Sequence, residues 1–92
     1  MPDTSPAQET LLEFPCTFPL KIMGLAGGPL AQTVLDIVLR HAPDYDGATM
    51  EMRASSGGKY VSLTCTISAT SRSQLDALYR ELTSHPLVKV VL

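Results

Sequence analysis

The sequence predicts an α+β domain of the ferredoxin-like, split βαβ kind, with a four-stranded antiparallel sheet and two helices on one face. In short segments apolar residues alternate with polar ones, and in two longer segments they recur every three or four residues. These segments follow the order βαββαβ. At 92 residues the chain is long enough for one hydrophobic core. We therefore expect a single domain over residues 11–92, preceded by a flexible, polar segment at residues 1–10.

The first strand is expected at residues 18–23 and the first helix from Pro29 to about His41. A glycine-rich connection at residues 24–29 separates them, and proline suits the first turn of a helix. An Ala-Pro pair then ends the helix. The strand would turn Phe18, Leu20 and Ile22 to one face and Lys21 and Met23 to the other. The helix would turn Leu30, Val34, Ile37, Val38 and His41 to the core.

Two strands joined by a glycine-containing hairpin are expected at residues 49–54 and 61–69, after a turn at residues 44–47. The later strand has the clearest pattern in the chain, with strict alternation and many β-branched residues. Its inward residues would be Val61, Leu63, Cys65, Ile67 and Ala69. In the earlier strand Met50, Met52 and Ala54 would share one face, with Glu51 and Arg53 on the other.

The last helix is expected to begin at a capping box formed by Ser71 and Gln74 and to end near Ser84. A short apolar strand at residues 88–92 closes the chain. The strands at residues 18–23 and 61–69 should be central because their patterns are clearest. A parallel pair of neighbouring strands would be unexpected anywhere else in the sheet than between these two. The helix would bury Leu75, Leu78, Tyr79 and Leu82.

The sheet face without helices is one candidate interaction surface, because it is free to meet solvent or a partner. A solvated face explains its mixed composition as well as a binding face does. The candidate interaction residues are Lys21, Met23, Arg53, Thr64, Thr66 and Lys89, beside which Glu51, Ser62 and Val91 are expected.

The glycine-rich connection is a second candidate site, for a small ligand. Gly24, Gly27, Gly28 and Pro29 could bring bare backbone amides at the start of a helix close to a small anion or an amino-acid carboxylate. The alternative is a tight turn that needs glycine for its conformation alone.

Composition argues against several classes of partner and reaction. The formal net charge is −2, with seven basic and nine acidic residues scattered singly, so neither nucleic acid nor a membrane surface is an expected partner. Cys16 and Cys65 match no metal or redox spacing, and no motif supplies a base to activate either thiol. His41 and His85 lie near helix ends, where the dipole alone explains them. We expect no catalytic residue, metal or cofactor, and a cytoplasmic location with both thiols reduced.

Several short motifs together resemble the YbeD-like family of small bacterial proteins of unknown function, sometimes labelled lipoate regulatory proteins. They are LLEFP at residues 11–15, Phe18, KIMG at 21–24, RHAP at 40–43, SSGGKY at 55–60 and VKVVL at 88–92. The resemblance implies a fold similar to ACT-type regulatory domains, which bind small ligands at interfaces between paired domains. Residues 27–30 look loosely like the first-loop ligand motif of those domains.

Taken together, these observations favour a non-enzymatic regulatory or adaptor domain that self-associates or binds a protein partner and senses a small metabolite in an ACT-like manner. The alternative is a protein-interaction module without a small ligand, acting through the open sheet face or an edge strand.

Overall fold

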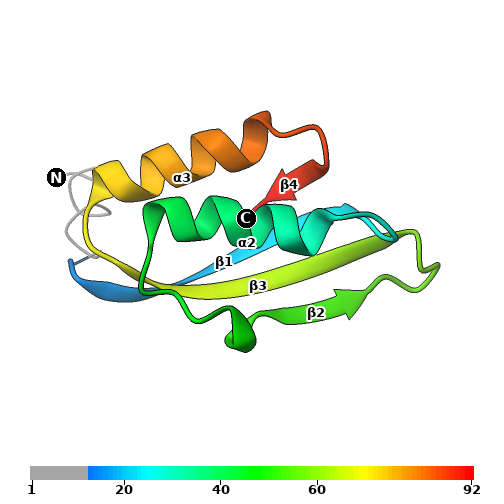
Figure 1. The fold of residues 1–92 in the computed structure, drawn as a ribbon, viewed down its shortest axis with the longest axis horizontal. Coiled ribbons are helices and arrows are strands. Elements are labelled where there is room, and N and C mark those ends of the chain that lie inside the picture. The colour runs from blue at the N-terminus through cyan, green and yellow to red at the C-terminus, as the bar shows by residue number, and fades with distance from the viewer. Residues whose placement is uncertain (1–12) are drawn as a thin grey trace, which may run out of the picture.

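A computed structural model describes residues 13–92, so the segment expected to be flexible at residues 1–10 lies outside the described residues. The elements are β1 (Cys16–Leu25), α2 (Leu30–His41), the short 3-10 helix η1 (Gly47–Thr49), β2 (Glu51–Ala54), β3 (Tyr60–Ala69), α3 (Arg72–Ser84) and β4 (Val88–Val91). The four strands form one sheet in the order β2-β3-β1-β4. Figure 1 shows α2 and α3 side by side across one face of it. The predicted ferredoxin-like fold is confirmed.

Every neighbouring pair of strands is antiparallel, so the predicted antiparallel sheet is confirmed, and the one parallel pair that the prediction tolerated, between the first and third strands, does not occur. The chain leaves β1, passes through α2 and returns as β2 on the far side of β3. β3 therefore lies between two strands that share a direction and runs opposite to both. The central position predicted for β1 and β3 is confirmed.

β1 is longer than the predicted strand and includes Pro19, which lies opposite Thr66 of β3. Further along β1, the backbone of Lys21 exchanges hydrogen bonds with Leu92, at 3.3 and 2.8 Å. Backbone groups alternate in direction along a strand, so the nitrogen of Pro19 also points to the β4 side, beyond the end of β4. The amide hydrogen that proline lacks therefore removes no bond from the sheet.

Gly24 was expected in the connecting loop but lies within β1, at a register shift in the pairing with β4. A Cβ atom at Gly24 would lie 2.4 Å from the Leu87 carbonyl oxygen and 2.8 Å from a methyl group of Leu30. This close approach of two backbones is what requires glycine at this position. The turn between β1 and α2 is correspondingly shorter than predicted and covers residues 26–29.

The core lies between the sheet and the two helices and contains the apolar stripes expected from the sequence. In β3, Val61 is half-buried and the other four inward residues are buried. His41 is half-buried, as is Tyr79. The Ser71 hydroxyl accepts a hydrogen bond from the Gln74 amide at 3.1 Å, while the Gln74 side chain accepts from Thr70 instead of Ser71. The largest fully buried side chains are Leu20, Ile22, Leu30, Ile37, Leu63, Ile67, Leu78, Leu82, Val34, Val38 and Cys65.

The inward orientation expected for Met52 and Ala54 does not bury them. Both are exposed, and Met52 is 62% accessible although it lies opposite the buried Leu63. In Figure 1 β2 lies at the border of the sheet, beyond both helices. Thr49, expected in this strand, belongs to η1.

β4 has a different phase from the predicted one. Val91 lies opposite the buried Ile22, so it shares the helix-covered face and is half-buried. Val90 lies opposite Met23 on the open face. The register shift at Gly24 adds a residue to the β4 side, and an extra residue reverses the alternation that a regular strand would have.

Candidate functional site

The open face of the sheet brings together most of the residues predicted as an interaction surface. Lys21, Thr64 and Glu51 form one cross-strand row over β1, β3 and β2. A neighbouring row contains Met23, Ser62 and Arg53, and Thr66 lies opposite Pro19 on the same face. Lys89 is exposed beside the register shift in β4 and has no paired residue in β1.

Two shallow hollows lie beside these rows and share Arg53 and Ser62. One has a volume of about 240 Å³, and the other about 190 Å³. The first contains hydroxyl and charged groups, and the second is more apolar. The first is lined by Lys21, Glu51, Met52, Arg53, Ser62 and Thr64, and the second by Met23, Arg53, Ala54, Ser55, Tyr60, Val61 and Ser62.

Large apolar side chains are exposed at one end of this face, over β1 and β4. Met23 lies opposite Val90, Leu25 lies opposite Tyr60, and Leu92 is hydrogen-bonded to Lys21. We call Met23, Leu25, Val90 and Leu92 the apolar end of the open face; their exposed fractions are 39%, 37%, 43% and 71%.

Three members of the apolar end were missed from the sequence. Leu25 falls in the predicted connecting loop, and placing Lys89 and Val91 on the open face turns Val90 away from it, because the register shift in β4 carries no clear sequence signal. Leu92 was placed in the last strand without a face. The signal that could have found them is the apolar character of the terminal VKVVL run, which is too long for one short strand to bury on a single face.

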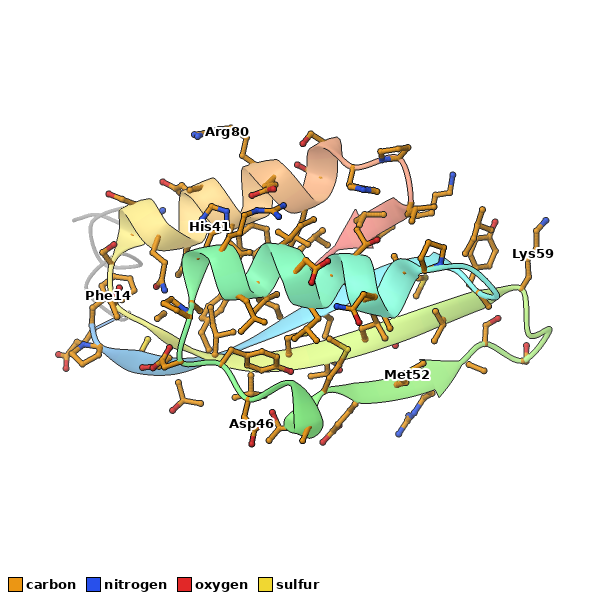
Figure 2. All side chains as sticks on the ribbon, viewed as in Figure 1. Phe14, His41, Asp46, Met52, Lys59 and Arg80 are labelled. Carbon is orange, nitrogen blue, oxygen red and sulfur yellow. The ribbon has the colours of Figure 1, made fainter. Side chains whose placement is uncertain are left out.

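Basic side chains surround the apolar end. Lys21 and Lys89 come from β1 and β4, and Arg53 and Lys59 come from β2 and the hairpin. The ion pairs within residues 13–92 involve Arg40, His41 and Arg72, so these four cations have no acidic partner in the described part of the chain. Lys59 Nζ lies 5.8 Å from the centre of the Tyr60 ring, and Figure 2 shows Lys59 at the hairpin end of the sheet.

The predicted first-loop site is an exposed turn. Gly27 has a φ of 86°, which favours glycine, whereas Gly28 has no such constraint. A Cβ atom would meet nothing within 4 Å at either position. Pro29 precedes α2, whose start has no side-chain cap and no acidic residue in its first turn. The turn therefore leaves backbone amides at the start of α2 without a side-chain partner, but Gly24 is not part of it.

The half-buried His41 connects the two helices. Its Nε2 atom lies 2.7 Å from Oε1 of Glu81, and Arg40 pairs with the same carboxylate. The hydrogen bond from Arg40, followed by that from His41, lowers the pKa of the Glu81 carboxyl. Gln74 Nε2 donates to the His41 carbonyl oxygen at 2.8 Å. Figure 2 shows His41 between α2 and α3, so a structural role accounts for it.

The remaining groups with reactive side chains are poorly suited to catalysis. Burial raises the pKa of the Cys65 thiol, which favours the unreactive protonated form. Burial likewise raises the pKa of the Tyr45 hydroxyl to about 12. Cys16 is half-buried at the start of β1, opposite Ala69. Within residues 13–92, no cluster of three or more His, Cys, Asp or Glu side chains could hold a metal ion.

Within residues 13–92, neither α2 nor α3 has the length and apolarity that crossing a membrane requires.

Comparison with known proteins gives one consistent result. A family model described as "Protein of unknown function (DUF493)" matches residues 9–92. A UPF0250 protein of Nitrosomonas europaea is 54% identical over 85 residues, which cover 92% of this chain and 98% of the relative. A UPF0250 protein of Ralstonia nicotianae is 51% identical over 88 residues, covering 96% and 91%. One from Bordetella pertussis is 51% identical over 87 residues, covering 95% and 96%.

Proposed function

We propose that this chain, which belongs to the DUF493 family of proteins of unknown function, is a non-enzymatic adaptor domain that binds a protein partner through the open face of its sheet. The partner would present apolar side chains flanked by acidic ones. The observation that carries the proposal is the apolar end of the open face, Met23, Leu25, Val90 and Leu92, bordered by cations without acidic partners. The names of the relatives describe no reaction, which agrees with a non-enzymatic role.

Burial of the apolar end would supply the affinity. Transfer of apolar surface out of water contributes about 25 cal/mol per Å², and four large side chains gathered on one face offer a contiguous area for it. Contiguous exposed apolar area is typical of interaction sites, whereas single exposed apolar residues are normal on any surface. Met23 and Val90 lie directly opposite each other, so they would form the centre of the contact.

Charge would select the partner and its orientation. Lys21 lies on β1, Lys89 on β4 and Lys59 in the hairpin between β2 and β3, all near the apolar end. Complementary charges at the border of an interface mainly increase the association rate and exclude partners of the same charge. An acidic partner is therefore favoured, and its association should slow as salt is raised.

A small-ligand sensor at the first loop is a second candidate function, and it corresponds to the ACT-like regulatory role implied by the family resemblance. The observation that favours it is the start of α2, which lacks both a side-chain cap and a first-turn acidic residue. Such a helix start attracts anions. The expected place of action for either function is the cytoplasm, where unpaired thiols such as Cys16 and Cys65 persist.

The test of the adaptor compares full-length variants in quantitative affinity capture. A Met23→Asp/Val90→Asp variant removes the centre of the proposed contact, and Arg80→Glu on the far side of α3 is the matched control. We expect one acidic protein to be captured by the wild type and the control and lost with the double variant. Circular dichroism would verify that each variant is folded. Capture that is identical for all three proteins contradicts the proposal.

The sensor is tested separately by thermal shift with amino acids, lipoate, octanoate and nucleotides. A ligand that binds only the folded state raises the melting temperature by mass action. If an amino acid or another carboxylate stabilises the wild type and a Gly28→Val variant loses this effect while keeping its own melting temperature, the first loop is the site. If no compound shifts the wild type, the sensor is rejected and the adaptor is unaffected.

A further inference from the structure

The outer edge of β2 is an uncovered strand edge. All four residues of β2 are exposed, and among residues 13–92 Met52 is the most exposed large apolar side chain after Leu92. Within residues 13–92, no strand lies on the outer side of β2. Figure 2 shows Met52 at the border of the molecule, away from both helices. An edge of this kind is a template for pairing with another strand.

The direction of the backbone groups in β2 follows from the pairing of the other strands. The mutual hydrogen bonds between Lys21 and Leu92 direct the backbone of Lys21 towards β4. Thr64, opposite Lys21, must then direct its N–H and C=O groups towards Glu51 of β2, because backbone direction alternates along each strand. It follows that Met52 and Ala54 direct their N–H and C=O groups outward, where they are free to pair.

We propose that β2 pairs in antiparallel fashion with β2 of a second copy of this chain, about a two-fold axis at Met52. In this register Met52 lies opposite Met52 of the second copy. Glu51 lies opposite Arg53 of the second copy, and Arg53 lies opposite its Glu51. The two sheets become one continuous eight-stranded sheet.

The sequence Glu51-Met52-Arg53 is self-complementary in this arrangement. A two-fold interface uses the same surface on both copies, so each contact occurs twice. Glu51 and Arg53 lie on the open face, and neither has an ion-pair partner within residues 13–92. Their positions across the axis are non-hydrogen-bonded ones, where opposed Cα atoms are only about 4.5 Å apart. Two cross-strand ion pairs therefore form on that face.

The same charges disfavour the neighbouring registers. A shift by two residues in one direction places Glu51 opposite Glu51, and a shift in the other direction places Arg53 opposite Arg53. Like charges directly opposite each other destabilise a strand pair. A shift by one residue would make the open face of one copy continuous with the helix-covered face of the other, so Glu51 and Arg53 would no longer face each other. The register centred on Met52 is the one that the charges select.

The opposite side of the strand pair buries apolar surface. Met52 faces the same side as Leu63, so the two Met52 side chains meet where the helix layer stops. Each Met52 exchanges backbone hydrogen bonds with its counterpart, and the Ala54 N–H can donate to the Met50 carbonyl of the second copy. The Met50 amide already donates to Gly47 at 3.1 Å, so pairing ends there. The contact is short, and a weak dimer is expected.

This dimer is independent of the adaptor proposal. The apolar end lies over β1 and β4, and β2 is at the opposite edge of the sheet. The dimer engages Arg53, one of the four basic residues near the apolar end, and leaves Lys21, Lys59, Lys89 and the apolar end itself free for a partner. Two copies of the open face in one continuous sheet would bind a repeated partner more tightly than one copy does.

Sedimentation equilibrium of the full chain over a concentration series tests the dimer. We expect the wild type to dimerise reversibly at concentrations on the order of 100 µM, as weak interfaces do. Glu51→Arg and Arg53→Glu each place like charges across the axis, and each should move the dimerisation midpoint on the order of tenfold higher. The Glu51→Arg/Arg53→Glu double variant restores opposite charges and should regain the wild-type midpoint. Arg80→Glu on α3, a change of the same size in net charge as Arg53→Glu, should leave it unchanged.

A mixing experiment provides the sharpest result. An equimolar mixture of the Glu51→Arg and Arg53→Glu chains pairs two arginines with two glutamates, so a heterodimer should form where neither chain dimerises alone. A wild type that stays monomeric at about 1 mM overturns the proposal. So does a wild-type dimer whose midpoint does not respond to either single variant.

Discussion

The two edge strands of the sheet have the same length and opposite surroundings. Val88 of β4 is buried, and Tyr79 of α3 donates a hydrogen bond from its hydroxyl to the Leu92 carbonyl just beyond β4. Met52 of β2 points to the same side of the sheet as the core and is nevertheless 62% exposed. The strands differ because α3 packs against β4, whereas neither helix lies over β2 (Figure 1). Burial in this domain is therefore decided by the helix layer, and an apolar residue in the correct phase is not sufficient.

The largest loss of stability is expected from a substitution in β3, one of the two central strands. Leu63 pairs with β1 and β2 and is fully buried, so Leu63→Ala should lower the free energy of unfolding by about 2 to 5 kcal/mol through the cavity that it leaves. Thr64→Ala on the open face should change it by less than about 0.5 kcal/mol. Urea denaturation of both variants measures the difference. Equal losses would mean that the open face is buried in solution, as in a face-to-face dimer.

The next effect tests how closely β4 is held. Gly24→Ala should cost about 1 to 3 kcal/mol, because its Cβ atom would overlap the Leu87 carbonyl oxygen and the chain before β4 would have to move. Gly28→Ala is the matched control, since a Cβ atom there meets nothing within 4 Å and φ is not positive. Thermal denaturation compares the two. A Gly24→Ala variant as stable as Gly28→Ala would show that the start of β4 shifts freely.

Substitutions in the two edge strands should lower stability less than those above, and the loss should be larger in β4 than in β2. Val88→Ala removes two buried methyl groups and should cost about 1 to 2 kcal/mol. Met52→Ala removes a longer side chain from an exposed position and should cost the monomer less than about 0.5 kcal/mol. Measurements at a few micromolar keep the chain monomeric. If Met52→Ala lowered the stability of the monomer more than Val88→Ala, some part of the chain other than α2 and α3 would have to bury Met52.

The local patterns predicted the fold because, in β3 and in both helices, apolar residues recur with the period of the element and so mark the face that it buries. The alternation along β3 and the Ser71 cap are signals contained within a few residues, and both appear in the structure. The exposure of Met52 depends on how far the helices extend, and local patterns carry no information about that. The phase of Val90 depends on a register shift at Gly24 in another strand. The alternation of residues in the strands was enough to predict most of the open face. Its apolar end could not be predicted in this way, because it depends on the register between strands that are far apart in the sequence.

The smallest expected effect concerns the contact between the two helices, which gives β4 its cover. Arg40 of α2 and the adjoining His41 both bind the Glu81 carboxylate of α3, and these hydrogen bonds lower the pKa of Glu81 in the folded chain. A carboxyl whose pKa is lowered by folding contributes stability above its unfolded pKa, and this contribution is lost as the pH falls through the folded pKa.

Glu81→Gln keeps the shape of the side chain and removes its charge. We expect it to be slightly less stable than the wild type at pH 7, and we expect this difference to disappear as the pH falls through the lowered pKa of Glu81 and the wild-type carboxyl becomes protonated. Because the ion pair is solvent-screened, the difference at pH 7 should also shrink in high salt. Chemical denaturation at a series of pH values from 7 downward measures it, and a difference that persists when the carboxyl is fully protonated would show that Glu81 joins the helices through its shape and not through its charge.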